Sequence, residues 1–135
     1  MAKDRREATG KIRPCPCGLG LPYDECCGPL HGGQAAASAE ALMRSRFSAF
    51  ALGDAAYLLR SWHSTTRPAR LLLDPRQRWT RLEVLDTESG GLLDTAGVVE
   101  FRAHYREPGE TGSVHERSRF VREHGHWVYL DGELS

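Results

Sequence analysis

The chain has 135 residues, and its 18 basic and 18 acidic side chains balance at a formal net charge of zero. This length allows one hydrophobic core, so we expect any second module to be a short appendage. The neutral balance removes the overall attraction to nucleic acid or anionic lipid that a strongly basic protein has. No apolar run approaches the roughly 20 residues that cross a bilayer, so we expect a cytoplasmic protein without membrane contact.

Residues 1–14 are charged and show no apolar period. Five basic residues stand between Lys3 and Arg13, interrupted by Asp4 and Glu7. We interpret this stretch as loosely attached to the rest of the protein. Its basic side chains could contact phosphates, but the acidic residues dilute the patch and no aromatic stacking group is present. Nucleic acid is therefore the less favoured partner.

All four cysteines of the chain lie within the next segment, in the spacing C-x-C-x8-C-C from Cys15 to Cys27. A reducing compartment keeps thiols free and favours metal binding over disulfides. Zinc takes four soft ligands in a tetrahedron, so two close pairs separated by a turn-forming loop can bind one ion. We expect Cys15, Cys17, Cys26 and Cys27 to hold a structural zinc. Free or oxidised thiols, and a ligand role for His31, are the alternatives.

Two helices are expected after this segment. The first runs from about Ser38 to Leu52, with Ser38 as its N-cap and Gly53 as its end. Its buried stripe comprises Ala39, Met43, Phe47 and Phe50, which recur at helical spacing. Asp54 can cap a second, shorter helix that carries Tyr57, Leu58 and Trp62 and is broken at residues 66–68. Residues 68–79 are ambiguous between a loop and a turn of helix.

The remainder of the chain has the period of strands. We expect strands at 81–88, 97–106 and 113–123, and a tight hairpin at His124-Gly125 that returns through residues 127–130. The second strand alternates clearly, because Val99, Phe101 and Ala103 fall on one face with Tyr105. Helices followed by an antiparallel sheet predict an α+β fold.

The cysteine segment resembles the SEC-C motif, the short zinc-binding module at the C-terminus of the translocation ATPase SecA. The matching pattern is C-P-C-G-x-G-x-x-Y-x-x-C-C-G, over about twenty residues. In that family the two early cysteines, the third cysteine and the residue after it hold zinc, which corresponds to the four cysteines named above. Leu19 departs from the serine that is common between the two glycines.

A second resemblance covers nearly the whole chain. The cysteine segment followed by residues 39–50, then Trp62-His63 and a closing segment at 127–132, is similar to the YchJ-like family of small bacterial proteins. This resemblance implies a nuclear-transport-factor-two-like (NTF2-like) domain, in which a curved antiparallel sheet wraps around helices to form a cone. We therefore expect a zinc-binding segment at residues 1–33 and an NTF2-like domain at residues 34–135.

A cone of this kind can enclose a pocket, so side chains that point inward are candidates for ligand binding. On the third strand Glu116, Ser118 and Phe120 share one face, and an inward Phe120 would bring Glu116 with it. A buried carboxylate needs a partner, and Arg46 and His63 are the candidates. A purely structural role as core residues or a scaffold ion pair is the alternative. The candidate pocket comprises Arg46, Trp62, His63, Phe101, Tyr105, Glu116 and Phe120.

Two functions are compatible with these features. The SEC-C resemblance implies an adaptor, because such motifs in the translocation ATPase contact a chaperone and the ribosome. Fold analogy allows a ligand-binding protein or an enzyme of the isomerase, dehydratase or hydrolase type instead, but a fold alone does not assign function. The sequence contains no Ser-His-Asp order, phosphate loop or dinucleotide fingerprint, so we name no catalytic residue. A third hypothesis is that zinc only stabilises the N-terminal segment.

Overall fold

The computed structural model describes residues 13–135, so the charged stretch before Arg13 lies outside the described residues. Four short or medium helices come first and four long strands follow. In chain order they are the 3-10 turn η1 (Tyr23–Glu25), the α-helices α2 (Cys27–His31), α3 (Ala39–Leu52) and α4 (Ala55–Arg60), and the strands β1 (Arg78–Ser89), β2 (Ala96–Glu107), β3 (Glu110–Glu123) and β4 (His126–Leu134).

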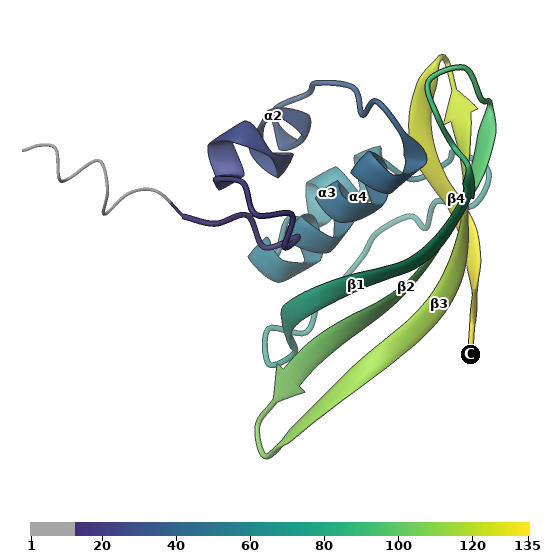
Figure 1. Ribbon diagram of the computed structural model, residues 1–135. Coiled ribbons are helices and arrows are strands. Elements are labelled where there is room, and N and C mark those ends of the chain that lie inside the picture. The colour runs from purple at the N-terminus through teal and green to yellow at the C-terminus, as the bar shows by residue number, and fades with distance from the viewer. Residues whose placement is uncertain (1–12) are drawn as a thin grey trace, which may run out of the picture.

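The four strands form one antiparallel sheet in the order β1-β2-β3-β4, with each strand joined to the next by a hairpin. The pairing register shifts twice in β1 and once between Arg119 and Phe120 of β3. Such bulges bend a strand and increase its twist, and the sheet is strongly curved (Figure 1). Helix α3 lies against one face of it, α4 packs on α3, and the cysteine segment lies on the other side of α3. The expected α+β order is confirmed.

The local signals for the helix ends are also confirmed. The Ser38 hydroxyl accepts a hydrogen bond from the amide of Ala41 at 3.0 Å, which satisfies one of the free donors at the start of α3. Gly53 ends the helix with a φ of 76°, a conformation that glycine adopts without a steric penalty. Asp54 then caps α4 by accepting from the amide of Tyr57 at 3.0 Å.

The second helix is shorter than the sequence predicts. It ends at Arg60, so the expectation that Trp62 belongs to it is wrong. The backbone of residues 61–63 instead pairs with β4: Tyr129 donates its amide to Ser61 at 2.9 Å, and His63 donates to Tyr129 at 2.8 Å. Residues 63–77 contain no helix, and β1 begins at Arg78, three residues earlier than predicted.

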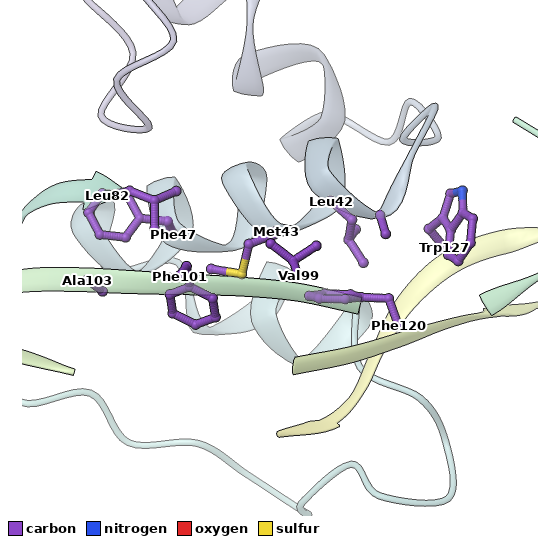
Figure 2. Close-up of a cluster of buried hydrophobic side chains, with 10 residues drawn as sticks. Leu42, Met43, Phe47, Leu82, Val99, Phe101, Ala103, Phe120 and Trp127 are labelled. Carbon is purple, nitrogen blue, oxygen red and sulfur yellow. The ribbon is translucent and has the colours of Figure 1, made fainter. Parts of the chain in front are cut away.

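The hydrophobic core lies between α3 and the concave face of the sheet (Figure 2). The predicted alternation on β2 is confirmed, since Val99, Phe101 and Ala103 point inward and are buried, while Tyr105 is half-buried. Phe50, predicted as part of the buried stripe, is half-buried and contacts the ring of Trp79 at the edge of the core. The buried cluster comprises Ala39, Leu42, Met43, Phe47, Leu82, Val99, Phe101, Ala103, Phe120 and Trp127.

Candidate metal centre

The cysteine segment folds into a closed loop that returns on itself. Pro14 and Pro22 form a β-bridge, and the amide of Cys15 donates to the carbonyl of Leu21 at 2.9 Å. Between them Gly18 and Gly20 adopt positive φ angles of 81° and 98°, which the reversal of the chain requires. The turn η1 then leads the chain back, so that the second pair of cysteines lies beside the first.

The four sulfur atoms gather in one small volume. All four lie within 4.8 Å of one another, and the Sγ atoms of Cys17 and Cys26 are 3.5 Å apart. A tetrahedral thiolate site with metal–sulfur bonds of about 2.3 Å has sulfur–sulfur distances of about 3.8 Å. Cys15, Cys17 and Cys27 are buried, and Cys26 is half-buried. The number, spacing and burial of the sulfur atoms therefore suit one tetrahedrally coordinated metal ion.

The pKa shifts of the thiols also favour a bound cation. A hydrogen bond from Cys27 is the main reason that the pKa of the Cys17 thiol falls to about 5. Burial raises the pKa of Cys26 to about 12, and the hydrogen bond to Cys17 raises the pKa of Cys27. Among Cys17, Cys26 and Cys27, the thiol of Cys17 is therefore the most acidic. A bound divalent cation would supply the charge that stabilises the other thiolates.

His31 is occupied elsewhere and does not belong to the sulfur cluster. Its Nε2 lies 2.8 Å from the carbonyl oxygen of Ser45, and because a carbonyl only accepts, Nε2 carries the proton. Its Nδ1 accepts from the hydroxyl of Tyr23 at 2.7 Å. The ring also packs against Tyr57, with the ring centroids 4.5 Å apart and the ring planes tilted by 54°. His31 thus fastens the cysteine segment to α3 through hydrogen bonds.

Residues of α3 that sequence reasoning did not connect with the cysteines complete this contact. The hydroxyl of Ser48 lies 3.4 Å from the Sγ of Cys15, and Arg44 donates to the carbonyl of Cys17 at 3.0 Å. Ser45 and Ser48 are fully buried although both are polar, on the helix face turned away from the sheet. The spacing of these two serines, three residues apart on one face of the helix, was the sequence signal for this contact. It predicts that a segment with polar groups covers that face.

The residues proposed for the cone pocket separate into groups. Arg46 is 4% exposed and donates to the carbonyl of Leu58 and the hydroxyl of Ser61, at 2.8 and 2.7 Å. Its guanidinium lies over the rings of Trp62 and Tyr129, 5.1 and 4.6 Å from their centroids. Burial lowers the pKa of Arg46 to about 10, so it remains charged at neutral pH.

Glu116 joins this group through Tyr129. Its carboxylate accepts hydrogen bonds from the hydroxyls of Ser118 at 2.6 Å and Tyr129 at 3.2 Å. Within residues 13–135 it forms no ion pair with Arg46. The interior therefore contains a linked set of Arg46, Tyr129, Glu116 and Ser118, in which Tyr129 was not among the predicted pocket residues.

Within residues 13–135 the side chains of the other predicted pocket residues form no hydrogen bond with this set, although the ring of Phe120 packs on Tyr129 with the centroids 5.8 Å apart. Phe101 and Phe120 are part of the hydrophobic core. Tyr105 packs on Trp79 with the ring centroids 5.2 Å apart, and His63 lies at the surface with its Nε2 3.8 Å from Glu123. The larger hollows on the described part of the chain lie elsewhere. One of about 480 Å³ is on the outer face of the sheet beside Arg117, one of about 430 Å³ lies beside Arg81 and Thr111, and one of about 330 Å³ separates the cysteine segment from the sheet.

The fold and the cysteine cluster together define a class of protein, an NTF2-like domain that carries a four-cysteine segment at its N-terminal side. Residues 38–132 match the model of a family described as the YchJ middle NTF2-like domain. The chain belongs to the YchJ-like family, which includes the UPF0225 proteins. A UPF0225 protein of Streptomyces coelicolor is 63% identical over 122 residues, which cover 90% of this chain and 95% of that protein.

Two solved structures are similar over nearly the whole chain. One is the solution structure of a SEC-C motif containing protein from Rhodopseudomonas palustris, with a TM-score of 0.77 and 38% identity over 91% of this chain and 99% of that one. The other is the crystal structure of a SEC-C motif containing protein from Psychrobacter arcticus, with a TM-score of 0.73 and 30% identity over 92% of this chain and 84% of that one. Both predicted resemblances are confirmed at the level of the family.

No helix within residues 13–135 is both long and apolar enough to span a bilayer.

Proposed function

We propose that Cys15, Cys17, Cys26 and Cys27 bind one zinc ion, and that the ion is structural. Four buried sulfur atoms within 4.8 Å support this proposal, because thiolate-rich tetrahedral sites favour zinc. Four protein ligands leave no coordination position for a substrate, which distinguishes the site from a catalytic one. A reducing cytoplasm would keep the thiols available for the ion.

We further infer that the zinc-bound segment is an adaptor that docks on another protein. The observation that carries this inference is a pair of exposed apolar side chains on the loop between the two cysteine pairs. Leu19 is 51% exposed and Leu21 is 42% exposed. The base of the same loop is fixed by sulfur ligation and by its contacts with α3. Apolar side chains on a preorganised loop lose little conformational entropy on binding, as docking residues should.

The partner that fits this loop is a protein with an apolar groove. It is either a free protein or a protein that is part of a ribosome. Nucleic acid is not favoured, because leucine side chains contribute neither charge for phosphates nor rings for bases.

The test is an affinity capture from bacterial lysate with three matched baits. The wild-type chain is compared with a Leu19→Ser, Leu21→Ser variant and with a control in which Leu92→Ser and Leu93→Ser remove the exposed leucines of the β1–β2 hairpin, 78% and 92% exposed. A protein retained by the wild type and the control but lost from the Leu19, Leu21 variant supports the adaptor. It must then bind the purified wild-type chain directly. The same captured proteins with all three baits would contradict it.

A ligand site in the cone is the second candidate. The buried charge of Arg46 and its link through Tyr129 to Glu116 favour it, because a buried guanidinium without an ion-pair partner is costly. The packed core around Phe101 and Phe120 weighs against it, since these rings fill the space that a ligand would take. The adaptor is therefore the function that the geometry supports better.

A further inference from the structure

A cleft separates the cysteine segment from the NTF2-like domain, and we call it the seam cleft. It encloses about 330 Å³. One wall is the chain that leaves α2, the second is α4 with Arg67, and the third is the turn between β3 and β4. Its lining comprises Leu30, Gly33–Ala36, Leu42, Tyr57, Arg60, Ser61, Arg67, Glu123, His124 and His126–Val128.

Two guanidinium groups line the seam cleft without a counter-charge. Arg60 donates from Nη2 to the carbonyl of His31 at 2.7 Å, and Arg67 donates from Nε and Nη2 to the carbonyl of Trp62 at 3.2 and 3.0 Å. Within the described range, neither guanidinium has a carboxylate within ion-pair distance. Both side chains are thus held in place by neutral acceptors while their positive charge stays uncompensated. Guanidinium groups fixed in this way are suited to bind a carboxylate or a phosphoryl group.

The one carboxylate of the cleft does not neutralise them. Glu123 accepts hydrogen bonds from both the amide and the hydroxyl of Ser64 and lies 3.8 Å from Nε2 of His63. These contacts, led by the Ser64 hydroxyl, lower the pKa of Glu123 and engage its oxygens on the side of residues 63–64. The remaining charged groups of the cleft are the two arginines, which leaves a net positive wall.

A buried residue whose donor has no partner also lines the cleft. Trp127 is 2% exposed, and its Nε1 has no hydrogen-bond partner among residues 13–135. Figure 2 shows this nitrogen at the end of the indole ring that points away from Phe120. A buried N–H without an acceptor is uncommon in folded proteins and calls for an explanation. An acceptor atom supplied by a ligand would provide one.

We propose that the seam cleft binds a small organic anion. A carboxylate or phosphoryl group lies at Arg60 and Arg67, and an apolar or aromatic body lies over Leu42 and Val128 with an acceptor atom near the indole of Trp127. The apolar part of the wall distinguishes this ligand from inorganic phosphate. The site is distinct from the cysteine cluster and from the proposed docking loop, so it stands or falls independently of the adaptor function.

The test is a titration of the ¹⁵N-labelled full chain followed by the indole and backbone amide resonances. Phenyl phosphate and phenylacetate are the two anionic probes, and comparing them distinguishes a phosphoryl from a carboxylate headgroup. Inorganic phosphate is the control without an aromatic body, and benzyl alcohol is the control without a charge. We expect saturable shifts of the Trp127 indole and of residues 34–36 with at least one aromatic anion, and binding at least tenfold weaker for both controls. Trp127→Phe assigns the indole resonance.

Matched variants decide whether the arginines are responsible. Arg60→Gln together with Arg67→Gln is expected to weaken the aromatic anion at least tenfold, since both positions are exposed and the change leaves the fold intact. Arg119→Gln, on the outer face of the sheet and paired there with Asp131, is expected to leave binding unchanged. The proposal is overturned if no probe gives saturable shifts up to about 10 mM, or if both variants bind as the wild type does.

Discussion

The two parts of this molecule are held together by different forces. The sheet and α3 enclose ten buried side chains in one apolar cluster, among them Phe47 and Phe120. In the cysteine segment, by contrast, the buried cluster consists of Cys15, Cys17 and Cys27, with Tyr23 and Cys26 packed against it. Burial of apolar surface can account for the stability of the first part, whereas the second part is too small to bury enough of it.

This difference predicts that metal binding and folding are coupled in one part only. If the proposed zinc ion binds, a segment whose core is four sulfur atoms acquires its order from that ion. The sheet would keep its own core without the ion. Four experiments, in descending order of expected effect, test that division.

Removal of two ligands should abolish the order of the cysteine segment. In a Cys26→Ser, Cys27→Ser variant we expect bound zinc to fall from about one equivalent per chain to less than about a tenth. The amides of residues 13–33 should lose hydrogen-exchange protection, while those of β2 and β3 keep it. Elemental analysis and hydrogen exchange measure the two effects. Equal loss of protection in the sheet would show that the two parts fold as one unit.

A cavity in the sheet core should destabilise the NTF2-like domain strongly. Phe120 of β3 is completely buried in the core cluster that the sheet shares with α3, so Phe120→Ala should lower the free energy of unfolding by about 3–5 kcal/mol. Denaturant unfolding followed by circular dichroism measures it. The matched control is Leu93→Ala at a side chain that is 92% exposed, where we expect no measurable change. A loss below about 1 kcal/mol at Phe120 would contradict a tightly packed core.

The hydroxyl of Ser48 should tune the metal site from the neighbouring helix. Because it lies 3.4 Å from the sulfur of Cys15, Ser48→Ala removes a hydrogen-bond partner of one ligand. Outer contacts of this kind typically change metal affinity by about 10–100-fold, and we expect the lower end of that range. Competition with a chromophoric chelator measures the affinity. Ser64→Ala, which alters an exposed serine far from the sulfurs, is the control, and equal affinities of the two variants would refute the coupling.

Loss of the helix cap should have the smallest effect of the four. Ser38→Ala leaves the amide of Ala41 without its acceptor and should cost about 1 kcal/mol. Ser38→Asp keeps an acceptor at the same place and should restore most of the loss. Thermal unfolding distinguishes the two variants. If both are equally destabilised, the side chain of Ser38 acts by some means other than capping.

The sequence predicted those features that depend on neighbours along the chain. Ser38 and Gly53 mark the ends of α3 because capping and left-handed geometry are local requirements. The alternation around Phe101 identified the inner face of β2, since the period of a strand is fixed by its backbone. The cysteine spacing likewise predicted that the four sulfur atoms gather in one place, because a short turn-forming loop joins the two pairs.

Features that depend on contacts between distant segments were not predicted. Trp62 has the spacing of a helical residue, but the free edge of β4 offers its neighbours backbone partners and ends the helix at Arg60. Ser48 and Arg44 contact the cysteine segment because of the face on which that segment settles, which no local pattern encodes. The cleft beside Trp127 arises for the same reason, from three segments that are far apart in the sequence.

The start of α3 is fastened to the β1–β2 hairpin at a point where no side chain fits. A methyl group on Gly97 would collide with the backbone of Gly90, and one on Gly90 would collide with Ala39, whose amide donates to the Gly90 carbonyl at 2.9 Å. Ser48 lies nine residues further along the same helix, or about 14 Å. A helix this short behaves as a rigid rod, so a widening of the glycine contact would tilt it and displace the sulfur-bearing loop at its other side. Gly90 and Gly97 thereby set the orientation of α3 and, through it, that of the loop that carries Leu19 and Leu21.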